Sequence, residues 1–188
     1  MKTRRDSADR LRLSRFKLDA LLDITLSINA NLPTEALLAK YESILRNELQ
    51  IGKILIFKHS DKWECILNGG FPENYSTDIS VENDLLGYTK TVFRDEIHGM
   101  EGVEIIIPVF NNSVPLAFVL IGDIEEEGQG VSPVIKHLNF VQTISSIILV
   151  AIENIRLFRE SLRQEALKKE LELAARMQQK LIPDNDLM

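Results

Sequence analysis

The sequence predicts an α+β fold: a central antiparallel sheet with helices over one face, loops and a short helix over the other, and a long C-terminal helix. Three observations predict it. Helical periodicity fills residues 10–50, and two pairs of apolar runs of strand length follow, each pair joined by a polar turn. No glycine or proline then lies between Pro133 and Pro183, which predicts the long helix.

The composition limits the classes of protein to which the chain can belong. It has 188 residues, of which 45% are hydrophobic, and a net charge of −6. These values are typical of one globular domain with some additional chain. The acidic balance argues against nucleic acid as a partner. The single cysteine, Cys65, excludes a disulfide framework and a multi-cysteine zinc site.

Residues 1–17 are a basic N-terminal segment, with seven Lys or Arg residues against two Asp residues. No apolar stretch or cleavage site follows it, so it is not a signal peptide. It fits the solvated start of a helix, and contact with a membrane surface or an acidic partner is the alternative. The longest apolar run, residues 147–152, is far short of the ~20 residues that cross a bilayer. We therefore expect no membrane span and a cytoplasmic location.

Two helices are expected at residues 10–31 and 34–50. Apolar residues recur at helical spacing in the first, and Leu18, Leu21 and Leu22 are expected to widen its buried stripe. It ends before Pro33, because a residue that precedes proline is driven out of the helical region. We expect Thr34 to cap the second helix and Gly52 to stop it.

Two hairpins are expected next. Residues 53–57 and 63–67 form the first, and residues 104–110 and 116–121 form the second around the turn tripeptide at 111–113. The second pair is apolar on both faces, so the sheet must be covered on both sides. The helices cover one side. The other is left to residues 71–103, with a short helix near 83–92 that turns Leu85, Leu86 and Val92 inward.

A sheet roofed by loops is a common way to build a small-molecule pocket. Trp63, Cys65 and Leu67 alternate along one strand and are expected to share a face, with Cys65 as a small core residue or, alternatively, a redox sensor. His98 is a candidate ligand contact. Core packing is the alternative role of every pocket candidate. The candidates are Trp63, Cys65, Phe71, Tyr75, Phe93, His98, Ile107 and Phe118.

No pattern of residues indicates catalysis or metal binding. The three histidines, His59, His98 and His137, lack metal-ligand spacing. The glycines mark turns and an acidic loop at residues 123–130, not a phosphate-binding loop. We therefore expect no catalytic residue, no metal site and no enzyme within these residues.

The last third is expected to be one helix at residues 134–181, roughly 70 Å long at ~1.5 Å per residue. A body of this size has a diameter of roughly 35–40 Å, so about half of the helix must project. Residues 134–158 are broadly apolar, whereas residues 159–181 carry a narrow stripe at coiled-coil spacing. The register of that stripe breaks near Glu165.

A narrow apolar stripe that projects cannot stay dry alone, so we expect a parallel homodimer. A helix that folds back on the body or frays is the alternative. The predicted dimer and signalling residues are Ile148, Ile155, Phe158, Leu162, Leu167, Leu171, Ala174 and Leu181.

The element order resembles that of the GAF domain, a relative of PAS sensory modules. The closest local similarity lies in Ile106-Ile-Pro-Val-Phe110 and Pro115-Leu-Ala-Phe-Val-Leu-Ile-Gly122, which resemble the last two strands of that family. The resemblance covers residues 18–158 and implies a sensory domain. The cyclic-nucleotide motif and the bilin-attachment cysteine of some members are missing. No cofactor is therefore implied, and whether a small-molecule ligand exists stays open.

The segment from Glu170 to Pro183 resembles the start of the catalytic domain of bacterial RsbU/SpoIIE-type phosphatases, metal-dependent serine phosphatases of the PPM class. The pattern A-x-x-x-Q-Q-x-L-[LI]-P runs from Ala174, or alternatively Ala175, to Pro183 and includes Gln178, Gln179, Leu181 and Ile182. The resemblance implies that residues 159–181 are a linker, that residues 182–188 begin an absent catalytic domain, and that the full protein is a serine/threonine phosphatase of sigma-factor regulation. The Asp-Gly metal motifs of the class do not occur here.

The resulting hypothesis is a sensory and dimerisation module that controls its own C-terminal phosphatase through the exit helix. Two alternatives stay open. The domain is a ligand-free docking or structural dimerisation module, or it is the sensor of a histidine kinase.

Overall fold

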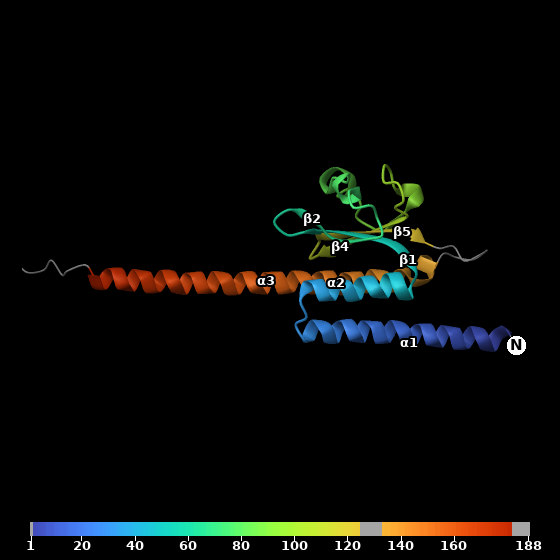
Figure 1. Cartoon of the computed structure of the whole chain (residues 1–188), viewed down its shortest axis with the longest axis horizontal. Helices are drawn as coiled ribbons and strands as arrows, with labels where there is room; N and C mark the ends of the chain where they lie inside the picture. The colour runs from blue at the N-terminus through green and yellow to red at the C-terminus, as the bar shows by residue number, and fades with distance from the viewer. Residues whose placement is uncertain (1, 125–132, 182–188) are drawn as a thin grey trace, which may run out of the picture. The chain divides into compact units, whose positions relative to one another are not determined.

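The computed structural model describes residues 2–124 and 133–181, with side chains described over residues 7–123 and 137–181. It contains one five-stranded antiparallel sheet of order β2-β1-β5-β4-β3, with helices on one side and the segment between β2 and β4 on the other (Figure 1). This arrangement confirms the expected α+β class. The longer elements are α1 (Lys2–Asn29), α2 (Thr34–Ser43), β1 (Ile51–His59), β2 (Trp63–Gly69), β4 (Ile105–Asn111), β5 (Val114–Ile124) and α3 (Pro133–Leu181). The shorter ones are η1 (Ile44–Glu48), η2 (Tyr75–Thr77), η3 (Val81–Leu85), β3 (Val92–Phe93) and η4 (Arg94–Glu96).

The first helix, α1, begins at Lys2, so the basic segment is part of this helix and not a separate element. Its inner side buries Ala20 and Ile24, and the Phe16 ring lies 6.3 Å from the Phe140 ring of α3. The expectation that Leu18 and Leu22 widen the buried stripe is wrong. They are 67% and 57% exposed, because α1 lies on the outer side of the helical layer and only one side of it meets α2 and α3 (Figure 1).

The second expected helix is α2 followed by one π-helical turn, η1, in which the Leu49 amide donates to the Ile44 carbonyl at 3.1 Å. Pro33 occupies the capping position of α2, so Thr34 is the first helical residue and not its cap. Gly52 does not stop the helix either. The chain turns at Gln50, which has a φ of 56°.

Gly52 instead lies in β1, where a Cβ would be 2.7 Å from the Asp123 carbonyl oxygen. The helical residues end at Glu48, two residues before the expected end, because Gln50 adopts a positive φ and the chain then enters β1 at Ile51.

Both hairpins form. β1, β2 and β5 are longer than the apolar runs indicated, whereas β4 has the expected length and is displaced by one residue. Asn112 and Ser113 connect β4 to β5 with φ values of 49° and 68°. Two consecutive positive φ values are typical of the type I′ turn, whose twist matches that of the strands it joins. The two dry faces are confirmed. Ile54 and Ile56 are buried on one face and Leu55 and Phe57 on the other.

The face that α2 and α3 cover has a hydrogen bond at its centre. The Tyr41 hydroxyl of α2 lies 2.7 Å from Ser145 Oγ of α3, and Ser145 Oγ donates to the Val141 carbonyl at 2.6 Å. Because the Ser145 hydroxyl donates its only proton to the Val141 carbonyl, the Tyr41 hydroxyl is the donor in its bond with Ser145 Oγ. Asp23 and Lys40 form an ion pair at 2.7 Å that connects α1 with α2.

The segment over the other face contains no regular helix at residues 83–92. It has the π-helical turn η3 and then β3, which pairs Val92 with Ile106 and Phe93 with Ile105. Leu85 and Val92 are buried as expected, whereas Leu86 is exposed. The fifth strand was missed because its two residues carry no periodic pattern.

The long helix α3 is continuous from Pro133 to Leu181, as the absence of glycine and proline predicted. The chain divides into two compact units between Ala151 and Ile152, within this helix. In the first unit α3 buries Phe140, Val141, Ile144, Ile148 and Leu149. The acidic loop and the final segment, residues 125–132 and 182–188, lie outside the described residues.

Candidate functional site

The sheet face opposite the helices holds a compact apolar cluster. The strands contribute Leu55, Phe57, Ile106, Phe118 and Leu120. The covering segment contributes Phe71, Val81, Leu85, Val92, Met100 and Val103, with Trp63, Tyr75, Ile79, Tyr88 and Ile97 packed against the cluster while partly exposed. Side chains of the strands and of the covering segment fill most of the space over this face. Space for a ligand therefore remains at the edge of the cluster.

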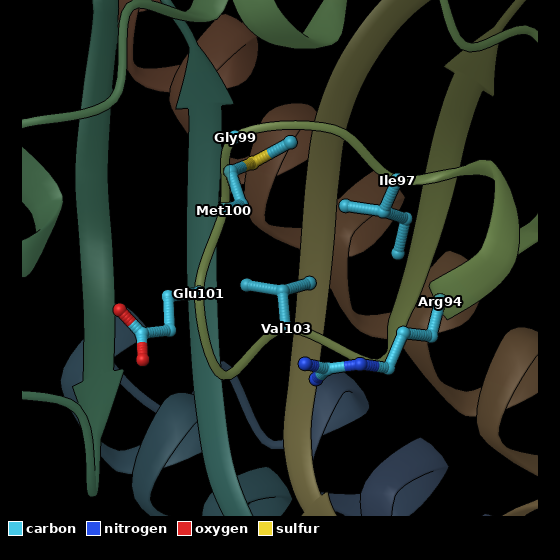
Figure 2. A pocket seen from close by; sticks show the side chains of 6 residues that line it. All are labelled: Arg94, Ile97, Gly99, Met100, Glu101 and Val103. Atoms are coloured by element: carbon cyan, nitrogen blue, oxygen red, sulfur yellow. The ribbon is translucent and has the colours of Figure 1, made fainter.

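A pocket of about 380 Å³ lies in the loop that follows η4 (Figure 2). Its walls come from a run of ten residues, and every one is in the segment that covers the sheet. The lining residues are Arg94, Ile97, Gly99, Met100, Glu101 and Val103. Met100 and Val103 are buried in the apolar cluster, so the floor of the pocket is continuous with the core.

The loop is held against the sheet by close backbone contact. A Cβ at Gly122 of β5 would clash with the Gly102 carbonyl oxygen, and the Glu104 amide donates to the Ile121 carbonyl at 2.8 Å. Gly102 itself has a φ of 81°, a conformation that side chains rarely adopt. The two glycines therefore let the loop lie directly on β5.

The side chain of Tyr75 also holds this loop in place. The Tyr75 hydroxyl donates to the Glu101 carbonyl at 2.5 Å, and its ring stacks on Phe71 with centroids 4.7 Å apart. Desolvation, and then the nearby Glu101 charge, raise the pKa of Tyr75. The hydroxyl therefore stays protonated at neutral pH and acts as a structural donor.

Four of the eight predicted pocket residues meet in the apolar cluster: Trp63, Phe71, Tyr75 and Phe118. The Trp63 ring lies 5.4 Å from Phe118 and 5.0 Å from His59. These contacts are those of core packing, the alternative role that the sequence left open for them.

Two other candidates lie on the opposite face. Ile107 pairs with Val119, which pairs with Ile56, so all three belong to the helix-covered face. Phe93 pairs with Ile105 on that same face and is 37% exposed. Neither side chain lies under the covering segment.

The expectation that Trp63, Cys65 and Leu67 share one face is wrong. Cys65 pairs with Phe57, but Leu67 pairs with Ile56, so the register shifts by one residue at Ile66. Such a bulge resets the alternation of side chains, and it places Leu67 on the helix-covered face.

Cys65 is exposed, which contradicts its expected role as a core residue. Its thiol donates to the Leu67 carbonyl at 3.4 Å. Desolvation raises the pKa of this thiol, and hydrogen bonds with Ser76 and Leu67 offset part of that rise. A thiol with a raised pKa is protonated at neutral pH and is a poor nucleophile.

None of the eight candidates lines the 380 Å³ pocket. His98 lies between the lining residues Ile97 and Gly99 in the sequence, but its side chain is exposed. Sequence reasoning missed Arg94, Met100 and Glu101. Residues 94–102 combine charged residues with two glycines, and this combination could have indicated a pocket loop. A search for apolar periodicity does not detect it.

Over the described residues, no group of three His, Cys, Asp or Glu side chains has the geometry of a metal site. The pocket combines one guanidinium, one carboxylate and apolar walls.

The structure is similar to the crystal structure of the GAF domain of a "putative sensor histidine kinase" from Pseudomonas syringae pv. tomato. The two match with a TM-score of 0.56 at 15% sequence identity, over 84% of this chain and 99% of that chain. The chain has a GAF-like fold. No protein-family model and no curated protein matches the sequence.

Beyond the GAF-like unit, the C-terminal part of α3 exposes a row of large apolar side chains. Leu162 is 50% exposed, Leu171 63% and Leu181 81%. Phe158, Leu167 and Ala174 of the predicted signalling set are also exposed, whereas Ile148 is buried and Ile155 half-buried. Charged residues surround this row, and one pair, Glu165 with Lys169, forms an exposed ion pair at 3.2 Å.

By length and composition, the stretch His137–Leu181 of α3 is apolar enough to cross a membrane. Half of its most apolar window is buried inside the protein. A helix that packs on a sheet passes the same test, and Val141 and Ile144 are such core residues. The expected absence of a membrane span stays a prediction.

Proposed function

We propose that the chain is a cytoplasmic GAF-type sensory and dimerisation module that regulates a C-terminal serine phosphatase through α3. One observation carries the proposal. A single helix leaves a GAF-like unit and continues with exposed leucines at coiled-coil spacing as far as the phosphatase-like pattern at Ala174, Gln178 and Leu181. Such a helix can relay a change in body packing as a shift or rotation of paired helices.

Self-association follows from the exposure of the stripe. Most helical stability in proteins comes from packing of an apolar face, and an apolar seam gains that packing against a second copy. The interruption of the stripe near Glu165 supports two competing registers, which is what a two-state relay requires.

The dimer is tested by sedimentation of the full chain and of a version that ends at residue 158. We expect the full chain to be a dimer and the shortened one a monomer. A shortened chain that still dimerises would move the interface into the body, where Leu18 and Leu22 of α1 are exposed.

A matched pair of substitutions separates the stripe from the rest of the helix. Leu171 lies on the stripe and Leu173 lies off it, and they are 63% and 56% exposed. Leu171→Glu should weaken the dimer at least tenfold, whereas Leu173→Glu should leave it unchanged. Equal effects would contradict a coiled coil in this register.

Control of a phosphatase is tested by the gene sequence beyond codon 188. Asp-Gly metal motifs there are the expected result. A phosphoacceptor helix in their place would favour the second candidate, the sensor of a histidine kinase, which the similarity to a GAF domain from such a protein supports.

A further inference from the structure

We propose that the pocket beside η4 binds a small organic carboxylate, with the carboxylate on Arg94 and the apolar chain against Ile97, Met100 and Val103. The inference rests on the sensory role proposed above and names the chemical class of the ligand.

Arg94 supplies the charge that selects an anion. Within the described chain no carboxylate forms an ion pair with its guanidinium, although Arg94 stands among acidic neighbours. Figure 2 shows the side chain running from η4 towards the loop at Val103, while the Glu101 carboxylate points away from it. A planar guanidinium binds a carboxylate through two parallel hydrogen bonds.

The backbone of the loop adds donors. Gly99, which lines the pocket, has a φ of 76°, and Gly102 has a φ of 81°. In the described part of the chain, the amides of Gly99, Glu101 and Gly102 have no hydrogen-bond acceptor. Glu101 and Gly102 are adjacent, and free amides beside a positive-φ residue favour anions. A cation is disfavoured here, because it needs oxygen lone pairs in place of its water and amide N–H groups offer none.

The remaining walls are apolar and define the rest of the ligand. Met100 and Val103 are buried side chains of the core cluster, and Ile97 packs against that cluster. A fully polar anion such as inorganic phosphate gains nothing from these walls. At ~30 Å³ for each water-sized group, 380 Å³ holds about a dozen groups, which suits a short acyl chain or a single ring.

The test uses the full chain, with hexanoate as the probe and hexanamide as its uncharged counterpart. Titration is followed by amide chemical shifts in two-dimensional NMR, which measures weak binding and locates it. We expect hexanoate to shift the amides of Gly99, Glu101 and Gly102 and to bind at least tenfold more tightly than hexanamide.

Arg94→Gln should weaken hexanoate binding about tenfold, since it removes one charged hydrogen-bonding partner from an otherwise unchanged pocket. Arg94 is exposed, so the variant is expected to fold. The matched control is Lys90→Gln, which removes the same charge from an exposed residue of the same segment outside the pocket. It should leave the affinity unchanged.

Three results overturn the proposal: no hexanoate binding at tens of millimolar, equal binding of hexanamide, or equal loss in the Arg94 and Lys90 variants. Sedimentation of the same samples reports self-association independently. If the chain dimerises through α3 but does not bind hexanoate, the proposed function stands and the proposed ligand class is wrong.

Discussion

Tyr41 connects two helices of the layer that covers the sheet. Its hydroxyl is completely buried and donates to Ser145 Oγ, so α2 and α3 are joined by a hydrogen bond that water does not reach. Burial raises the pKa of Tyr41 well above its ordinary value, because a phenolate at this position would be desolvated.

Tyr41→Phe should lower the free energy of unfolding at pH 7 by about 1 kcal/mol, the usual contribution of one hydrogen bond. The difference should shrink as the pH rises above ~10, the pKa of an unfolded tyrosine. There the unfolded wild-type chain releases a proton that the folded chain keeps, so wild-type stability falls by up to about 1.4 kcal/mol per pH unit through this group.

Urea unfolding of both proteins at neutral pH and above pH ~10 measures that difference. Tyr88→Phe is the control, because the hydrogen bond from the Tyr88 hydroxyl to the Glu96 carbonyl is long, at 3.3 Å, and exposed. Its loss should therefore change the free energy of unfolding little. A gap between wild type and Tyr41→Phe that stays constant with pH would contradict the account.

At the scale of the element, the β4–β5 turn carries a residue that its conformation does not favour. Ser113 has a φ of 68° and lies in open space at the end of the hairpin. Glycine adopts this conformation without steric cost, and it is the preferred residue at the second position of a type I′ turn.

Ser113→Gly should therefore raise the free energy of unfolding by about 0.5–1 kcal/mol, and Ser113→Val should lower it. Thermal unfolding of the two variants tests the order glycine, serine, valine. The opposite order would show that the hairpin adopts another turn in solution.

The elements also show where pattern reasoning works. The hairpins, the two dry faces of the sheet and the length of α3 follow from local patterns that the sequence displays directly. The bulge at Ile66 is different, because it depends on how β2 pairs with Phe57 and Ile56 of β1. A bulge of one residue reverses the face of Leu67, so an error of one in register reverses a prediction about the site.

At the scale of the whole molecule, the two compact units differ in how they bury apolar surface. The unit that ends at Ala151 has a sheet that is dry on both faces. In the unit that begins at Ile152, Leu162 and every later leucine of the described helix are exposed in a single chain. From Leu162 to Leu181 the second unit therefore lacks the burial that stabilises the first.

From this contrast we predict that protection of the amides of residues 159–181 against hydrogen exchange rises with protein concentration. Amides of β1 and β5 should be unaffected, because their pairing lies within one chain. Exchange measured at low and high micromolar concentration tests this. Uniform protection at all concentrations would contradict a reversible dimer.

The sequence by itself determined the order of the elements, the need for covers on both sheet faces and the single long helix. These features follow from periodicity, turn residues and the absence of helix breakers, all of which act between residues close together in the chain. The GAF resemblance rested on the same order, and the fold agrees with it.

Only the tertiary structure decided the short strand β3, the face of Leu67 and the position of the pocket. Each depends on contacts between distant residues: Val92 with Ile106, Ile56 with Leu67, and Gly102 with Gly122. The pocket shows this most clearly. Arg94 and Met100 belong to no apolar periodic pattern, and they line a cavity in a loop that lies against β5 at Gly122.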